Sequence, residues 1–454
     1  MSEKDIFTKK SLDIEGNLSE TEETFIDSYG KHEQKPLRIL LSLYKGHYLQ
    51  LVLSGLFFAL KHACVWYLPV ATAGVINIAS GTDDGGLSGI LFYISIEIAL
   101  VLINMPANYL YVHFRSLAIR NMEAGLRGAL VRKLQQLSIT YHKEMQSGRL
   151  QSKIMRDVEA IETLSQQLFT NILTILLNLI VAFAVTGMRS RTVLIFFVIC
   201  GPVAALTMVA FKNQIKRTNS TFRKEMETTS AKVMEMVELI PVTRAHALED
   251  EEIDKMENQL SSVAKSGYRL DIVQANFGAV GWGVFQVFQV LCLGFTGYLA
   301  FHGQTTVGDI TLYQTYFSTI VNQISSFINL LPIISKGLES VNSVGEVLLA
   351  NDVENNKGKT KIKSVRGQFD FENLCFGYDS SKPVLNHLNL HVEPGETIAL
   401  VGESGAGKST VLNMVIGFNK PDSGRILLDG MDMNTINLQS YRQHIAVVPQ
   451  TSIL

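Results

Sequence analysis

The stretch Gly402–Ser409 reads GESGAGKS and matches the pattern G-x-x-x-x-G-K-[ST] at every fixed position. The run before it, Thr397–Val401, is short, apolar and rich in β-branched residues, which predicts a buried strand. The run after it, Thr410–Ile416, predicts the start of a helix. A strand, a glycine-rich loop and a helix in this order form the context in which this pattern holds a phosphate.

The residue types in this loop suit phosphate chemistry. Glycines let the backbone wrap around an anion, and the exposed N–H groups with the helix dipole favour negative charge. Lys408 would reach the β- and γ-phosphates, and the Ser409 hydroxyl would ligate Mg²⁺. We therefore predict ATP and Mg²⁺ as cofactors. The predicted binding residues of the loop are Gly402, Glu403, Ser404, Gly405, Ala406, Gly407, Lys408, Ser409 and Thr410.

The long part of the chain ahead of this loop has the composition of a membrane protein. Of 454 residues, 47% are hydrophobic and only 18% are charged, with a mean hydropathy of +0.18. A membrane-spanning helix needs about 20 apolar residues. Charge-free tracts such as Leu168–Val185 argue against a large soluble helical core. Six segments meet the length: Tyr48–Ala79, Leu87–Val112, Leu164–Gly187, Val193–Phe211, Phe277–Phe301 and Ile310–Ile334.

The distribution of Lys and Arg predicts the orientation of these segments. Both long stretches, between the second and third segments and between the fourth and fifth, are rich in Lys and Arg. The short stretches Gly81–Gly86 and His302–Asp309 contain neither residue. Because basic loops stay on the cytoplasmic side, we predict cytoplasmic termini and a multi-pass protein of the plasma membrane. Arg189 and Arg191 lie on the predicted outside and depart from this pattern. The net charge of −2 does not indicate a nucleic-acid partner.

The first 40 residues are polar and acid-rich, which predicts a mobile tail, and they contain no apolar core of a cleavable signal peptide. The four cysteines, Cys64, Cys200, Cys292 and Cys375, show no paired spacing. They indicate neither a disulfide framework nor a metal site.

The two basic stretches also carry a helical apolar pattern, so we expect the membrane helices to continue well into the cytoplasm. Each excursion would end in a short turn able to press on another domain. In the first stretch the apolar positions are Leu117, Ile119, Leu126, Leu130, Leu134 and Leu137, and in the second they are Val233, Met236, Val237 and Ile240.

From about Lys35 to Leu454 the chain resembles the exporter class of ATP-binding cassette (ABC) transporters. Tyr141–Val158 and Glu238–His246 are similar to the two coupling regions of that family. Phe371–Tyr378 resembles the first strand of the nucleotide-binding domain, and Val447–Gln450 resembles the Q-loop. The resemblance implies that Tyr378 stacks on adenine and that Gln450 approaches Mg²⁺.

The resemblance implies a fold class: a six-span α-helical membrane domain with long cytoplasmic extensions, followed by an incomplete α/β P-loop nucleotide-binding domain. The expected divisions are a tail over 1–40, a membrane domain over 41–340, a linker over 341–365 and the first part of the nucleotide-binding domain over 366–454. The family's Asp-Glu strand, signature motif and switch histidine come later than Gln450, so we expect them to be missing.

Two functions follow from the resemblance. One is ATP-driven export of an amphipathic compound, lipid or peptide by a homodimer or heterodimer of half-transporters. The other is a non-hydrolysing membrane remnant that at most binds a partner subunit.

Charged and polar residues within the membrane segments are candidates for a cargo route. Lys61 and Glu97 lie deep in the first two segments, where charges are costly. They either pair and fix the packing of two helices, or line a cavity. The polar residues that would join them are Gln286, Gln289, Asn322 and Gln323.

Overall fold

The computed structural model describes residues 20–32, 35–145, 147–354, 356–378, 382–403 and 405–448. Within these ranges it does not describe the side chains of residues 20, 32, 143, 144, 147, 148 and 200–213. The chain divides into two compact units. One unit holds Met1–Tyr48, Ser116–Ser165 and Ile333–Leu454, and the other holds Leu49–Arg115 and Gln166–Pro332.

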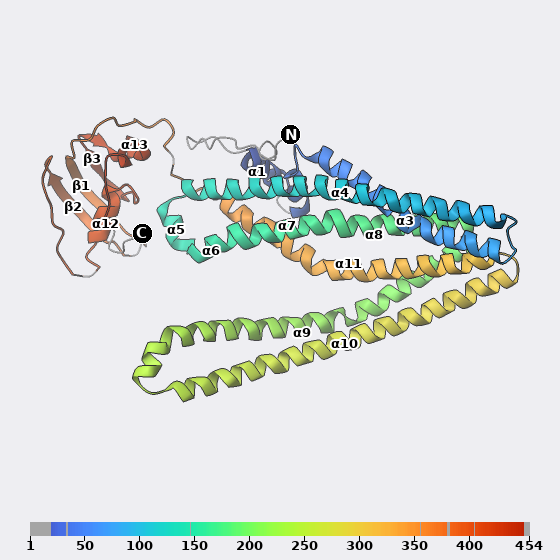
Figure 1. Cartoon of the computed structure of the whole chain (residues 1–454). Coiled ribbons are helices and arrows are strands. Elements are labelled where there is room, and N and C mark those ends of the chain that lie inside the picture. The colour runs from blue at the N-terminus through green and yellow to red at the C-terminus, as the bar shows by residue number, and fades with distance from the viewer. Residues whose placement is uncertain are drawn as a thin grey trace. The chain divides into compact units, whose positions relative to one another are not determined.

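Most of the chain is helical, as predicted (Figure 1). Five described stretches are long and apolar enough to cross a membrane: Tyr48–Ala79 (α3), Gly86–Gln136 (α4), Arg149–Arg189, Glu249–Phe301 (α10) and Val307–Leu348 (α11). They contain five of the six predicted segments. The other, Val193–Phe211, lies on α9 (Arg191–Ala245), where side chains 200–213 are not described. A sixth span therefore stays a prediction.

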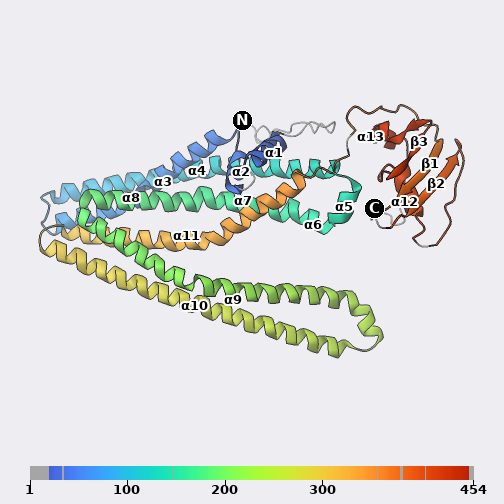
Figure 2. The same cartoon turned by 180° about the vertical axis from the view of Figure 1, so that it is seen from behind.

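The predicted helical extensions are confirmed. Helix α4 has 51 residues, α9 has 55 and α10 has 53, well beyond the length that a membrane requires. Helices α9 and α10 run antiparallel side by side (Figures 1 and 2). Between the long helices of the first excursion lie short elements: α5 (Ile139–Met145), α6 (Ser147–Ser152), a π-helical turn η2 (Lys153–Asp157) and α7 (Val158–Gln167), which continues through η3 (Leu168–Ile172) into α8 (Leu173–Arg189).

The prediction of a mobile N-terminal tail is wrong for residues 20–32, and residues 1–19 lie outside the described part. Glu20–His32 forms helix α1, followed by α2 (Pro36–Ser42). Phe25 is fully buried, and its ring stacks with that of Tyr29. Both rings pack at Gly345 of α11, where a Cβ would come within 3.1 Å of Tyr29 Cε2. A few apolar side chains on one face of α1 are therefore enough to hold the helix, once α11 supplies the surface on which they pack.

The C-terminal region contains a four-stranded antiparallel sheet in the order β2-β1-β3-β4. Its strands are β1 (Phe369–Phe376), β2 (Leu385–Val392), β3 (Ser423–Leu428) and β4 (Met431–Asp432). Helix α12 (Lys408–Val415) packs on it through the buried Met414, and η4 (Met433–Thr435) and α13 (Leu438–Arg442) complete the core. The Tyr441 hydroxyl donates to the Val415 carbonyl at 2.7 Å, and burial raises the pKa of Tyr441 to about 12.

Two local predictions fail in this region. Thr397–Val401 is not a strand, and Val401 is 92% exposed, because the described residues place no parallel strand beside it. An apolar strand of this kind needs neighbours on both sides and covered faces. Residues 341–348, predicted as linker, form the last turns of α11, since Val341, Val344 and Leu348 continue its buried face.

Candidate nucleotide-binding site

The glycine loop leads directly into the first turn of α12. The helix begins at Lys408, and Gly407 is its N-cap, with φ of 84° and no side-chain capping bond. The backbone N–H groups of the first turn are therefore not capped by a neighbouring side chain, which leaves them able to bind an anion. A Cβ on Gly407 would lie 2.9 Å from Leu385 Cδ2, so both conformation and space require glycine here.

The Lys408 side chain folds back over the loop. Its Nζ donates to the carbonyl of Gly402 at 2.8 Å and to that of Glu403 at 2.6 Å. Phosphate oxygens carry full negative charge and would compete with these neutral carbonyls for the ammonium group. Ser409 is exposed in the first turn of α12, whereas Thr410 is buried. The residues present fit a nucleotide phosphate, and the exposed Ser409 hydroxyl is the one oxygen among them that would serve as the predicted ligand of Mg²⁺.

Tyr378 lies beside this loop. It follows β1 by two residues, and its hydroxyl is 3.5 Å from Thr410 Oγ1. Asn419 Nδ2 donates to the same hydroxyl at 3.2 Å, while the Tyr378 residue as a whole is 56% exposed. Sequence reasoning missed Asn419 because no local pattern connects it with Tyr378. Stacking of Tyr378 on adenine stays a prediction.

Four further loop residues were predicted to bind the nucleotide. Glu403, Gly405 and Ala406 are exposed in the loop, where the Ala406 N–H donates to the Glu403 carbonyl at 3.2 Å. Ser404 lies outside the described residues, and so does Gln450, the second predicted Mg²⁺ ligand.

A second candidate site is a cavity of about 400 Å³ among α3, α8 and α11. Trp66 Nε1 donates to Asn178 Oδ1 at 2.7 Å, and the Tyr316 hydroxyl donates to the Trp66 carbonyl at 2.9 Å. The predicted residues Asn322 and Gln323 line this cavity. Its walls hold neutral polar and apolar side chains together: Val65, Trp66, Leu68, Pro69, Thr72, Asn178, Thr315, Tyr316, Thr319, Asn322 and Gln323.

The other predicted cavity residues lie elsewhere. Lys61 Nζ donates to Asn108 Oδ1 at 3.1 Å and faces the Tyr111 ring at 4.5 Å, so the predicted Lys61–Glu97 pair is wrong about the partner. Asn108 lies about 16 Å further along α4 than Glu97 and on nearly the same face, so Lys61 and Glu97 lie at different heights along their helices. Gln286 and Gln289 lie on α10 and are not among the residues that line this cavity.

These features define a class of protein: a P-loop nucleotide-binding protein with an attached bundle of membrane-crossing helices. The family described as "ABC transporter transmembrane region" matches residues 51–324, and the one described as "ABC transporter" matches residues 385–454. Because the first match covers more than half of the chain, the chain belongs to the ABC transporters.

Relatives and solved structures agree with this family. The chain is 24% identical over 82% of its length to the ATP-binding/permease protein YgaD of Bacillus subtilis, whose name provisionally assigns it to multidrug export. It is 29% identical over 69% of its length to an ATP-dependent lipid A-core flippase of Alcanivorax borkumensis. The matches span 65% and 54% of these relatives, respectively. A bacterial Atm1-family ABC exporter with ATP bound shares the fold, with a TM-score of 0.70 at 19% identity, over 90% of this chain and 72% of that one.

Proposed function

We propose that this chain is one subunit of an ATP-driven exporter that moves an amphipathic compound, a lipid or a peptide across the plasma membrane. One observation carries the proposal: a phosphate loop and a set of membrane-crossing helices with a neutral, partly polar cavity occur in one chain. The names of the relatives, multidrug export and lipid A-core flippase, support the cargo class.

The start of α12 and Tyr378 would divide the parts of the nucleotide between them. The N–H groups at the start of α12 and Lys408 hold the phosphates, Ser409 ligates Mg²⁺, and the exposed ring of Tyr378 packs on adenine. Gln450, which lies outside the described residues, would be the second ligand of Mg²⁺. Bound ATP would supply the β–γ phosphoanhydride bond whose hydrolysis drives transport.

A second subunit, identical or related, completes the transporter. The ends of α9 and α10 next to their connecting turn, which we place in the cytoplasm, expose apolar side chains: Val237 is 55% exposed, Val242 50% and Ile253 52%. Exposed apolar surface of this kind marks a protein contact. The resemblance of Glu238–His246 to a coupling region supports a nucleotide-binding domain as the partner of this turn.

Nucleotide binding to the chain in lipid nanodiscs tests the proposal. A fluorescent ATP analogue with Mg²⁺ should bind, and Lys408→Ala should weaken binding by about tenfold or more, since a hydrogen bond to a charged group contributes about 1.5–3 kcal/mol. Lys363→Ala, at an exposed position outside the loop, is the matched control. Equal affinity of both variants would overturn the site.

One observation favours the alternative of a non-hydrolysing remnant. Val401 is 92% and Val448 93% exposed, and the segments that hold them pair with no strand among the described residues of the nucleotide-binding region. ATP hydrolysis by the purified chain separates the two functions, because a remnant would bind nucleotide or partner without turnover.

The fluorescence of Trp66 can report on the cargo cavity, because Trp66 lines it. The chain has two tryptophans, and the other is Trp282. In a Trp282→Phe background, an amphipathic ligand should quench Trp66. Asn322→Ala should weaken that binding roughly threefold or more, through loss of a hydrogen bond. Gln286→Ala is the control. An equal loss of ligand affinity in that variant would indicate a cargo site next to α10 and not in this cavity.

A further inference from the structure

The segment that follows α11 is bonded to the cytoplasmic end of α4. Leu137 and Val353 form an antiparallel β-bridge. The Ser138 N–H donates to the Asp352 carbonyl at 2.9 Å, and the Glu354 N–H donates to the Gln136 carbonyl at 2.8 Å. These backbone bonds hold the segment against the residues that join α4 to α5, just before Tyr141–Val158, the stretch that resembles the first coupling region.

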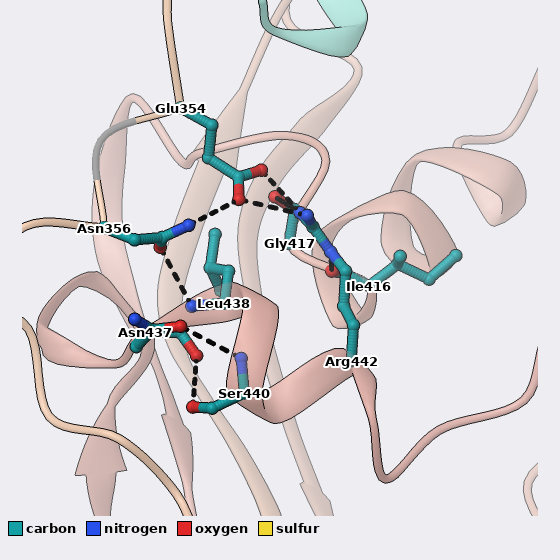
Figure 3. A network of polar contacts seen from close by, with 8 residues as sticks. All are labelled: Glu354, Asn356, Ile416, Gly417, Asn437, Leu438, Ser440 and Arg442. Atoms are coloured by element: carbon teal, nitrogen blue, oxygen red, sulfur yellow. Dashed lines mark hydrogen bonds and ion pairs between the residues drawn. The ribbon is translucent and has the colours of Figure 1, made fainter. Parts of the chain in front are cut away.

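The side chain of Glu354 continues this connection into the nucleotide-binding region. It forms a forked ion pair with Arg442 of α13, with Nη1–Oε1 at 3.1 Å and Nη2–Oε2 at 2.8 Å (Figure 3). Asn356 donates to Glu354 Oε1 at 3.0 Å and accepts from the Leu438 N–H at 3.0 Å. Both charged side chains are 26% exposed, so solvent screens this pair only in part.

Arg442 also reaches the far end of the phosphate-loop helix. Its Nε donates to the Ile416 carbonyl and its Nη2 to the Gly417 carbonyl, each at 3.0 Å (Figure 3). Its guanidinium lies over the Phe418 ring at 5.1 Å. Helix α12 has only eight residues, about 12 Å of rigid rod. A displacement of its first turn by a bound phosphate would therefore reach the carbonyls that Arg442 holds.

We propose that Glu354 and Arg442 are positioning residues that relay nucleotide binding from α12 to the junction of α4 and α5. The path runs from the phosphate loop through α12 to Arg442, then through Glu354 to the bridge of Val353 with Leu137. The inference rests on the proposed nucleotide binding. A purely structural clamp would stabilise the region without making the α4–α5 junction respond to nucleotide.

Hydrogen exchange of the full chain in nanodiscs, with and without ATP and Mg²⁺, tests this relay. Addition of nucleotide should change exchange over residues 134–145 by at least about threefold. Glu354→Gln should abolish that response while the nucleotide affinity stays within about twofold, because Arg442 keeps both of its carbonyl bonds.

A matched control breaks an ion pair off this path: Glu372→Gln removes the Arg425–Glu372 contact at 2.6 Å and should leave the response intact. If Glu354→Gln impairs nucleotide binding itself, Asn356→Ala loosens the same carboxylate and should reduce the response by half or more.

Two outcomes separate the relay from the proposed function. Nucleotide binding without any change over 134–145, or an unchanged response in Glu354→Gln, overturns the relay and leaves nucleotide binding standing. Failure of the unaltered chain to bind nucleotide in the fluorescence assay overturns the proposed function and the relay together.

Discussion

Arg189 and Asp309 form an ion pair, with Nη1 of the arginine 2.9 Å from Oδ1 of the aspartate. The pair joins the last turn of α8 to the first turn of α11, and Asp309 is only 8% exposed. Arg189 is one of the two basic residues that depart from the charge asymmetry of the loops. Its side chain pairs with a nearly buried carboxylate and so helps to pack α8 against α11. Counting Lys and Arg in the loops could not detect this role.

Arg189→Gln should destabilise the membrane unit by roughly 1–3 kcal/mol, because it leaves a buried carboxylate without its charged partner. Thermal unfolding in detergent measures the effect as a lower midpoint. The control is Arg191→Gln, which removes an exposed arginine at the start of α9. In the double variant Arg189→Gln/Asp309→Asn the losses should not add, and simple additivity would contradict the pairing.

The glycines of the phosphate loop allow a second comparison. Gly405 and Gly407 have φ of 88° and 84°, but a Cβ on Gly405 meets nothing within 4 Å, whereas one on Gly407 would come 2.9 Å from Leu385 Cδ2. Gly405→Ala should cost about 1–2 kcal/mol from backbone conformation alone. Gly407→Ala should cost roughly 1–3 kcal/mol more, from overpacking against β2. Denaturant unfolding followed by hydrogen exchange in β2 measures both, and equal losses would show that contact with Leu385 does not matter.

The loop could be predicted from sequence because its chemistry is local. Gly407 and Lys408 occupy fixed positions in a short pattern, and the helix that follows them is determined by neighbouring residues. The long helices could be predicted for the same reason, because the apolar pattern that indicates a helix lies within a single segment of the sequence. Length and pattern were sufficient for α4 and α10.

Features that depend on distant partners were not predictable. Phe25 is buried because α11 presents Gly345 to it, and the polar sequence around Phe25 indicated only a tail. Thr397–Val401 has the composition of a strand, but pairing decides whether it becomes one. Lys61 has Asn108 as its partner because the way α3 and α4 pair decides which residues lie at the same height, and Glu97 lies about 16 Å nearer the turn that joins the two helices.

The packing of α1 leads to a third prediction. Phe25→Ala removes a fully buried ring, at a cost of about 3–5 kcal/mol, and should release α1 from its contact with α11. Trypsin cleavage after Lys31, an exposed residue near the end of α1, should then become at least about tenfold faster. Glu23→Ala changes an exposed position on the same helix and should leave the rate unchanged. Cleavage of Phe25→Ala at the rate of the unaltered chain would mean that this ring does not hold α1.

The last prediction concerns pH. His391 of β2 lies opposite Asp370 of β1 in the sheet register, and its Nδ1 bonds to that carboxylate while its Nε2 lies 3.0 Å from Glu393 Oε1. The hydrogen bond to Asp370, and then that to Glu393, raise the pKa of His391, and the same bond to His391 lowers the pKa of Asp370. A raised histidine pKa stabilises the fold fully below the unfolded value of about 6.5, and this stabilisation disappears as pH rises through the folded value. The aspartate contributes above its unfolded pKa of about 3.9 and loses its contribution as pH falls through its lowered folded pKa.

The unaltered chain should therefore be more stable than His391→Gln at about pH 6, where the charged His391 pairs with Asp370. The stabilities of the two proteins should become equal by about pH 9, because only the charged form of His391 makes this ion pair and both side chains are open to solvent. Unfolding midpoints of the two proteins across this range measure the gap. His444→Gln, which removes an exposed histidine near α13, controls for the general effect of losing an imidazole. A gap between the unaltered chain and His391→Gln that stays constant over the whole range would show that the pairing with Asp370 does not depend on the charge of His391.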